Sequence, residues 1–228
     1  MTIATSPSPV QLRHGRTMLQ LHCRKRADGP NLLLLHELFA NAHAWDEEVL
    51  SWDGSVWALD FSGHGGSGWR EGGVYFPETL AADADAALGE LGEAFVAGAG
   101  VGAYAALLLA GGRPDHVPAA LLLPGEGLAG HGPEPDHEPN LDGFAQLSSA
   151  HRSSTEPGSA AHDPRVLLAG ADARPADYAR TFAERARRVV LVEDGTARPP
   201  WWEGLRDLAS VSVCNADIPG ALRTLANP

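Results

Sequence analysis

The chain has 228 residues, of which 44% are hydrophobic and 20% are charged, which is the composition of a folded globular protein. Its 29 acidic and 17 basic side chains give a net charge of −12. This excess of negative charge argues against nucleic acid or an anionic membrane as a partner, because both are bound through basic surfaces. The length suits one domain with a single core, and we expect that domain to span residues 1–228.

The cysteine content and the N-terminus indicate a cytoplasmic protein. Cys23 and Cys214 are too few for a disulfide framework. One bridge between them is an alternative, but two free thiols in a reducing compartment are the preferred interpretation. No window holds the roughly 20 apolar residues of a membrane span, and Met1–Val10 lacks the basic and apolar regions of a signal peptide.

Turn residues and apolar runs divide the first half of the chain into expected elements. His14-Gly15-Arg16, between two alternating segments, predicts an N-terminal hairpin. Continuous apolar runs predict strands that are buried on both faces, and longer apolar segments predict helices. The expected strands are 32–35, 55–61 and 94–97 (the last breaking at Gly98), and the expected helices are 44–52, 77–91 and 101–110.

The second half continues the alternation of short strands with helices. We expect strands over 118–123, 165–169 and 189–192, and helices over 176–187, 199–208 and 219–225. Such alternation predicts a parallel sheet that is covered by helices on both faces. The exception is 124–164, which is rich in Gly, Pro, Ser and His; a loop of this length in a compact domain is usually functional or mobile.

Several segments, in a fixed order, resemble those of the α/β-hydrolase superfamily. LLLLHELFANAHAW resembles the strand and loop that supply half of the oxyanion hole, and ALDFSGHGGSG resembles the Asp-x-x-Gly-His-Gly-x-Ser turn. FVAGAGVGAYAALLLA resembles the strand, turn and helix of the nucleophile elbow. Residues 165–175 and 189–203 resemble the last two strands, whose ends carry the acid and the histidine. The resemblance covers about residues 10–210 and implies the α/β-hydrolase fold, a mostly parallel sheet flanked by helices.

The superfamily's nucleophile does not carry over. Its elbow reads G-x-S-x-G, whereas this chain has Gly98-Ala99-Gly100-Val101-Gly102, which puts Gly100 at the serine position. Residues 91–110 contain no Ser, Cys, Thr or Asp. Because acyl-enzyme chemistry needs an oxygen or sulfur nucleophile, we expect no ordinary serine-esterase activity.

The resemblance also predicts that the other two triad positions are degenerate. It places the acid at Ala173, or at Asp172 if the alignment slips by one residue, and the histidine at Ala197. The loss of the histidine does not depend on alignment, since no histidine follows His162.

The oxyanion hole can survive the loss of the triad, because its donors are backbone N–H groups. The resemblance assigns them to Leu38 and Val101, next to His36 and Gly100 respectively. Such a pair binds a carbonyl oxygen, an enolate or a carboxylate. The alternative is that a buried side chain or water fills the site.

Two carboxylates are candidates for acid–base chemistry. Glu37 replaces the glycine of the superfamily's His-Gly pair, and Glu126 follows an expected strand at the edge where sheet ligands bind. If both face one cavity, they form an acid–base pair without a nucleophile. The alternative is that each is a loop residue exposed to solvent.

No metal or cofactor is expected. The segment that holds His131, Glu134, Asp136, His137 and Glu138 has zinc-ligand residue types, but its prolines prevent a helix that would present two ligands on one face. We expect a solvated acidic loop there. The shortened lid, 125–163, leaves the pocket open or covered by a flap or a partner chain, so a homodimer is a further expectation.

The leading hypothesis is an α/β-hydrolase relative that has lost serine hydrolysis. It binds a small carbonyl-containing or apolar molecule at the old active site, either without catalysis or for a nucleophile-free reaction such as cyclisation or elimination. One alternative is a hydrolase in which a carboxylate activates water. The other is a structural subunit with a collapsed site.

Overall fold

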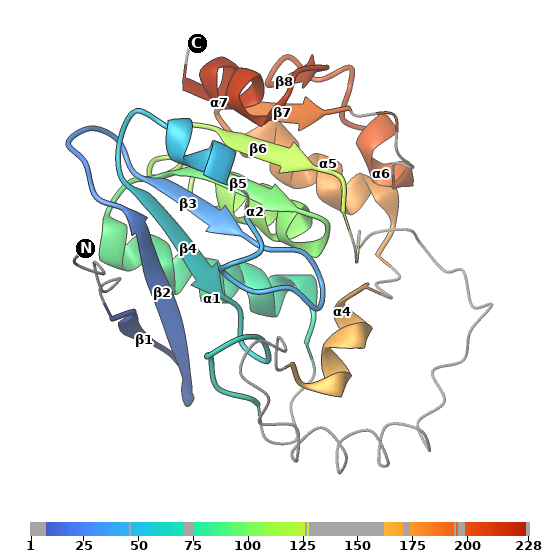
Figure 1. The fold of residues 1–228 in the computed structure, drawn as a ribbon. Helices are drawn as coiled ribbons and strands as arrows, with labels where there is room; N and C mark the ends of the chain where they lie inside the picture. Colours follow the sequence, from blue (N-terminus) through green and yellow to red (C-terminus); the bar gives the residue numbers. More distant parts are fainter. Residues whose placement is uncertain are drawn as a thin grey trace.

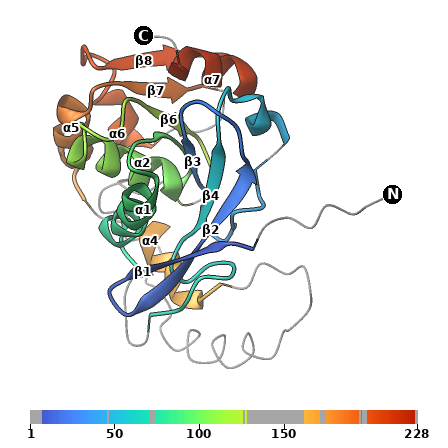
Figure 2. The same cartoon turned by 90° about the vertical axis from the view of Figure 1, so that its left-hand side faces the viewer.

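The computed structural model describes residues 8–45, 47–70, 75–125, 127, 162–170, 174–193, 195 and 199–226. The described residues form one eight-stranded sheet with the order β1-β2-β4-β3-β5-β6-β7-β8 (Figures 1 and 2). Strands β1 and β2 are antiparallel to their neighbours, and β3 to β8 are parallel. The strands are β1 Val10–His14, β2 Thr17–Lys25, β3 Leu32–Leu35, β4 Val56–Asp60, β5 Phe95–Ala99, β6 Ala120–Leu123, β7 Val189–Val192 and β8 Val211–Cys214.

Helices cover both faces of the sheet, as the alternating pattern predicted (Figure 1). One face is covered by α1 (Pro77–Leu91), α2 (Val101–Gly112), α5 (Ala176–Arg185) and α6 (Pro200–Glu203). The other face is covered by the 3₁₀-helix η1 (Glu47–Ser51) and by α7 (Ile218–Ala226). At the tips of the strands lie η2 (Pro164–Val166) and α4 (Leu167–Gly170).

The leucine run of β3 shows why both faces need a cover. Leu33 and Leu35 pack into the core beneath α1, α2 and α5, whereas Leu32 and Leu34 pack into the core on the side of η1 and α7. Successive side chains of a strand point to opposite faces, so a continuous apolar run is stable only between two layers.

Most expected elements form, but several differ. The expected strand over 165–169 is wrong, because this segment forms η2 and α4. Asp163 accepts the N–H of Arg165 and Pro164 takes the first helical position, both of which favour a helix start. Strand β5 continues through Gly98 to Ala99, the expected helix over 44–52 is reduced to η1, and β8 was not expected.

Two further observations concern the thiols and the lengths of the helices. Cys23 on β2 and Cys214 on β8 are free cysteines. Among the described helices, none combines the length and the apolar character that a membrane span requires.

A buried carboxylate joins the N-terminal hairpin to the rest of the fold. Asp83 on α1 is fully buried and accepts hydrogen bonds from the Ser62 N–H at 2.9 Å and the Ser62 hydroxyl at 2.6 Å. Its other oxygen lies 2.6 Å from Nδ1 of His14 at the end of β1. One side chain therefore holds α1, the hairpin and the turn after β4 together.

We expect Asp83→Asn to lower the free energy of unfolding by about 2–4 kcal/mol, because an amide presents a donor where buried donors need an acceptor. Urea denaturation measures the change. Asp115→Asn is the matched control: the Asp115 side chain is 88% exposed and pairs with Arg187 at the surface, so a change within about 1 kcal/mol is expected there. Equal effects of the two substitutions would contradict this role of Asp83.

Candidate functional site

The carboxyl ends of the parallel strands meet at one edge of the sheet, which is where open α/β sheets bind ligands. The parallel pairing of β3 with β4 and β5, and of β5 with β6, brings four loop starts together there. They are His36, Phe61, Gly100 and Pro124. The candidate site is built around Gly100.

Gly100 makes the turn between β5 and α2. Its φ of 56° and ψ of −123° are a conformation that residues with a side chain rarely adopt. A Cβ on Gly102 would collide with the carbonyl oxygens of Leu35 and His36, so the start of α2 approaches β3 very closely. The backbone has the shape of the strained strand-to-helix turn that carries the nucleophile of α/β-hydrolases, with glycine at its centre.

The two expected oxyanion donors are the N–H of Val101, directly after this turn, and the N–H of Leu38, in the loop after β3. Val101 is the first residue of α2, so its N–H has no acceptor within the helix. In the described part of the chain, no group accepts a hydrogen bond from the N–H of Val101 or of Leu38. The Leu38 side chain is buried against Gly127 and Gly170, which fixes the loop that carries its amide.

The Glu37 carboxylate lies beside the elbow. A Cβ on Gly125, just after β6, would lie 2.6 Å from Glu37 Oε2 and 2.9 Å from the Gly100 nitrogen. The separation of these two atoms is therefore at most the sum of these distances. The Glu37 side chain is partly buried, and it points toward the centre of the elbow.

His36 fixes the loop that carries Glu37. Its Nδ1–H donates to the Glu37 carbonyl oxygen at 2.7 Å, and its Nε2 accepts the Phe61 N–H at 3.2 Å. Burial lowers the pKa of His36 to about 4, against a smaller opposing effect of the Glu37 carbonyl. The imidazole is therefore neutral near pH 7, and both of its nitrogens are hydrogen-bonded to backbone atoms.

The glycine-rich turn after β4 is held by Asp60. Its carboxylate accepts the N–H of Ala42 at 2.7 Å and of Gly66 at 2.9 Å, and His22 Nε2 lies 3.1 Å away. Burial raises the pKa of Asp60, but these hydrogen bonds outweigh it and leave the pKa below its usual value. Within this turn, His64 is fully buried.

Asp163 connects the far side of the site to the fold, and no sequence pattern used above predicted this role. Asp163 is buried and accepts hydrogen bonds from Tyr75 and Arg165, while its N–H donates to the Gly63 carbonyl oxygen. The neighbouring His162 forms a β-bridge with His64. An Asp-Pro pair at the end of a long irregular segment is the helix-capping signal that could have found this anchor.

The sheet order moves the expected position of the acid. Strand β7 pairs with β6, and β8 is the last strand, so the last two strands are 189–192 and 211–214. The residue after β7 is Glu193, which lies 2.7 Å from Arg206, and Asn215 follows β8. The assignment of Ala173 assumed a strand at 165–169, and the assignment of Ala197 assumed that 189–192 is the last strand. Both residues lie outside the described part of the chain.

Other expected features also fall outside the described residues. These are Glu126, the metal-ligand types of 131–138 and most of the 125–163 lid. Within the residues that are described, no group of three or more His, Cys, Asp or Glu could hold a metal ion.

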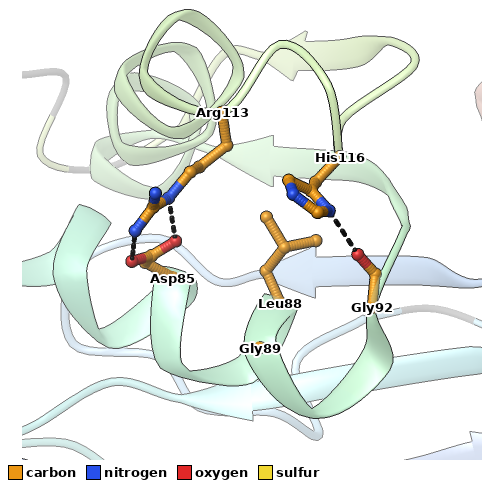
Figure 3. A pocket seen from close by; sticks show the side chains of 6 residues that line it. All are labelled: Asp85, Leu88, Gly89, Gly92, Arg113 and His116. Carbon is orange, nitrogen blue, oxygen red and sulfur yellow. Dashed lines mark hydrogen bonds and ion pairs between the residues drawn. The ribbon is translucent and has the colours of Figure 1, made fainter.

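A pocket of about 220 Å³ lies at the opposite end of α2 from Gly100 (Figure 3). Arg113, which follows α2, makes two hydrogen bonds to Asp85 along one wall, and His116 Nδ1 donates to the Gly92 carbonyl oxygen at 2.8 Å. These polar groups join the C-terminal ends of α1 and α2. The length of α2 separates this pocket from Gly100, so it is not part of the elbow site.

Comparison with known proteins supports the fold. No model of a known protein family matches the chain. A hydrolase from Pseudomonas aeruginosa PA01 superposes with a TM-score of 0.69 at 17% identity, covering 98% of this chain and 100% of the hydrolase. The Bottromycin epimerase BotH, in complex with Bottromycin A2, superposes with a TM-score of 0.62 at 20% identity, covering 96% and 94% of the two chains.

A sequence relative has been found for part of the chain. Esterase Rv0045c from Mycobacterium tuberculosis is 36% identical over 96 residues, which are 41% of this chain and 32% of the esterase. The match spans about a third of the esterase's length. The chain therefore has the α/β-hydrolase fold, which it shares with a hydrolase and an epimerase, and part of its sequence is similar to an esterase.

The buried neutral His36 makes stability depend on pH. The unfolded state takes up this proton near pH 6.5 and the folded state only near pH 4, so acidification between these values favours unfolding. We expect His36 to contribute a loss of about 3 kcal/mol over this range. Urea denaturation at pH 7 and at pH 4.5 should show a smaller difference for His36→Asn than for the unaltered chain. The exposed His43 provides the control, since His43→Asn should leave the difference unchanged.

Proposed function

We propose that this chain binds a small carbonyl-containing molecule above Gly100 and does not form an acyl-enzyme with it. The single observation that carries this proposal is a glycine at the centre of an intact elbow. An elbow without a side chain keeps its backbone donors and loses its nucleophile. Binding is either non-catalytic or serves a nucleophile-free reaction, such as a cyclisation or an elimination.

The histidines support the loss of the triad. No histidine follows His162, so none can follow β7 or β8, the strands whose ends carry the acid and the base in the superfamily. His36 and His64, the buried histidines of this edge, both have a pKa below the ordinary value because of burial. Neither is suited to accept a proton from a serine at neutral pH.

The preference for a carbonyl ligand follows from the donors. The Val101 N–H is at the N-terminus of α2, where the helix dipole favours negative charge. With the Leu38 N–H it provides the type of backbone pair that stabilises an oxyanion. A carbonyl oxygen, polarised by two such donors, is the ligand atom that fits them.

The proteins that resemble this chain include both an epimerase and an esterase. One structure with this fold is named an epimerase, whereas the relative over 96 residues is named an esterase. A specific observation favours a second candidate function, a hydrolase in which Glu37 activates water: the Glu37 carboxylate lies near the Gly100 nitrogen.

A serine-directed fluorophosphonate probe should not label the protein, because no hydroxyl stands at the elbow. We expect Gly100→Ser to remain unlabelled as well, since the new serine has no base. The side chain at φ 56° should also lower the free energy of unfolding by about 1–3 kcal/mol. Mass spectrometry of the treated protein and urea denaturation measure these outcomes. Stoichiometric labelling of Gly100→Ser would show that a base is present and would overturn the proposal.

Hydrolysis of 4-nitrophenyl acetate separates the two candidate functions. Binding of a carbonyl compound without an acyl-enzyme predicts no hydrolysis above the rate in buffer. The second predicts turnover that falls by about 100-fold or more in Glu37→Gln, which removes a general base, and not in Glu90→Gln. Glu90 is an exposed residue of α1 and is the matched control.

A further inference from the structure

We propose that Glu37 removes a proton from the carbon next to the bound carbonyl group, and that the elbow amides hold the resulting enolate. The substrate class is an ester, thioester or amide with a hydrogen on its α-carbon. This inference rests on the proposed function, because it needs a carbonyl group held above Gly100. It adds the reaction and the residue that performs it.

The geometry places the Glu37 carboxylate near the backbone of the elbow. Glu37 Oε2 and the Gly100 nitrogen both lie within 3 Å of one point beside Gly125. Gly100 is followed directly by Val101, whose N–H is an expected oxyanion donor, and Glu37 is followed directly by Leu38, whose N–H is the other. The base and both donors therefore come from two pairs of consecutive residues that follow the neighbouring strands β3 and β5.

Three other ionisable groups of this edge, His36, His64 and Asp60, contact backbone atoms. Both nitrogens of His36 are hydrogen-bonded to the loops after β3 and β4. His64 Nδ1 lies 3.3 Å from the Ser62 carbonyl oxygen, and the ring is fully buried. The Asp60 carboxylate accepts hydrogen bonds from two backbone N–H groups, and His22 Nε2 lies 3.1 Å from it. Glu37 is partly buried, and its carboxylate reaches the space between Gly125 and Gly100.

The step is balanced without a co-reactant. The C–H bond of the α-carbon breaks and its proton moves to a Glu37 oxygen. The electron pair forms the carbon–carbon double bond of the enolate, and the carbonyl π-pair moves to the oxygen that the two amides hold. Return of a proton to carbon restores the carbonyl compound and the carboxylate. Protonation on the other face inverts the α-carbon, and the exchange of the Glu37 proton with water introduces solvent hydrogen.

A glycine at position 100 favours this step over acyl transfer. The superfamily's serine would place an oxygen nucleophile at the carbonyl carbon. Without the serine, the reactive side chain beside the substrate is the Glu37 carboxylate. The N–H groups of Leu38 and Val101 can stabilise an enolate oxygen in the same way as a tetrahedral oxyanion. The same scaffold therefore supports proton transfer at carbon.

The test uses (R)-2-phenylpropionyl probes as the methyl ester, the N-acetylcysteamine thioester and the amide, incubated with the whole protein in D₂O. We expect ¹H NMR to show loss of the α-proton signal, and chiral chromatography to show loss of optical purity, without release of 2-phenylpropionic acid. Glu37→Gln should slow exchange by about 100-fold or more, as expected for a general base. Glu90→Gln should exchange at the unaltered rate.

Probe binding is measured in parallel, by the concentration-dependent line broadening of the phenyl protons. Saturable binding with no exchange would overturn the proton-transfer proposal and leave the proposed function standing. Exchange that persists in Glu37→Gln while the probe still binds would overturn the role of Glu37. Release of 2-phenylpropionic acid that depends on Glu37 would favour the water-activating hydrolase instead. Absence of binding by all three probes would count against both proposals.

Discussion

The close approach of α2 to β3 determines the geometry of the site. Gly102 brings the first turn of α2 against the carbonyl oxygens of Leu35 and His36, which leaves no room for a side chain. Gly100 must then reverse the chain within a single residue, in a conformation that glycine adopts at little cost. The positions of the Val101 amide, the loop after β3 and the loop after β6 all follow from this contact.

A site made from backbone persists when its catalytic side chains change. The proposed oxyanion donors are N–H groups whose positions depend on the elbow and on the loop that His36 holds, and neither requires a serine. A glycine at position 100 also removes the strain that a serine would bear there. In this chain Glu37 stands where the superfamily's motif has glycine, and its carboxylate lies near the backbone of the elbow.

The sequence was sufficient for the N-terminal hairpin and the central strands, but not for the last strand, β8. The run Leu32–Leu35 predicted β3 because a strand between two helical layers is apolar at every position. The same argument failed at 165–169, since a short apolar run does not distinguish a strand from a buried helix. Strand β8 escaped notice because it is an edge strand with partly exposed residues. The direction of Glu37 depends on Gly125, a contact between distant segments that no local pattern reports.

The position of the acid depends on how the chain is aligned with the superfamily, whereas the absence of a late histidine does not. The assignment of the acid to Ala173 required that 165–169 be a strand, and it fails because β7 is the strand beside β6, with Glu193 after it. The missing histidine requires only that no histidine follows His162, which holds wherever the strands begin. An acid without a histidine to orient cannot activate a serine. The proposal that this fold no longer works as a serine hydrolase therefore depends on the nucleophile and the base, and not on the acid.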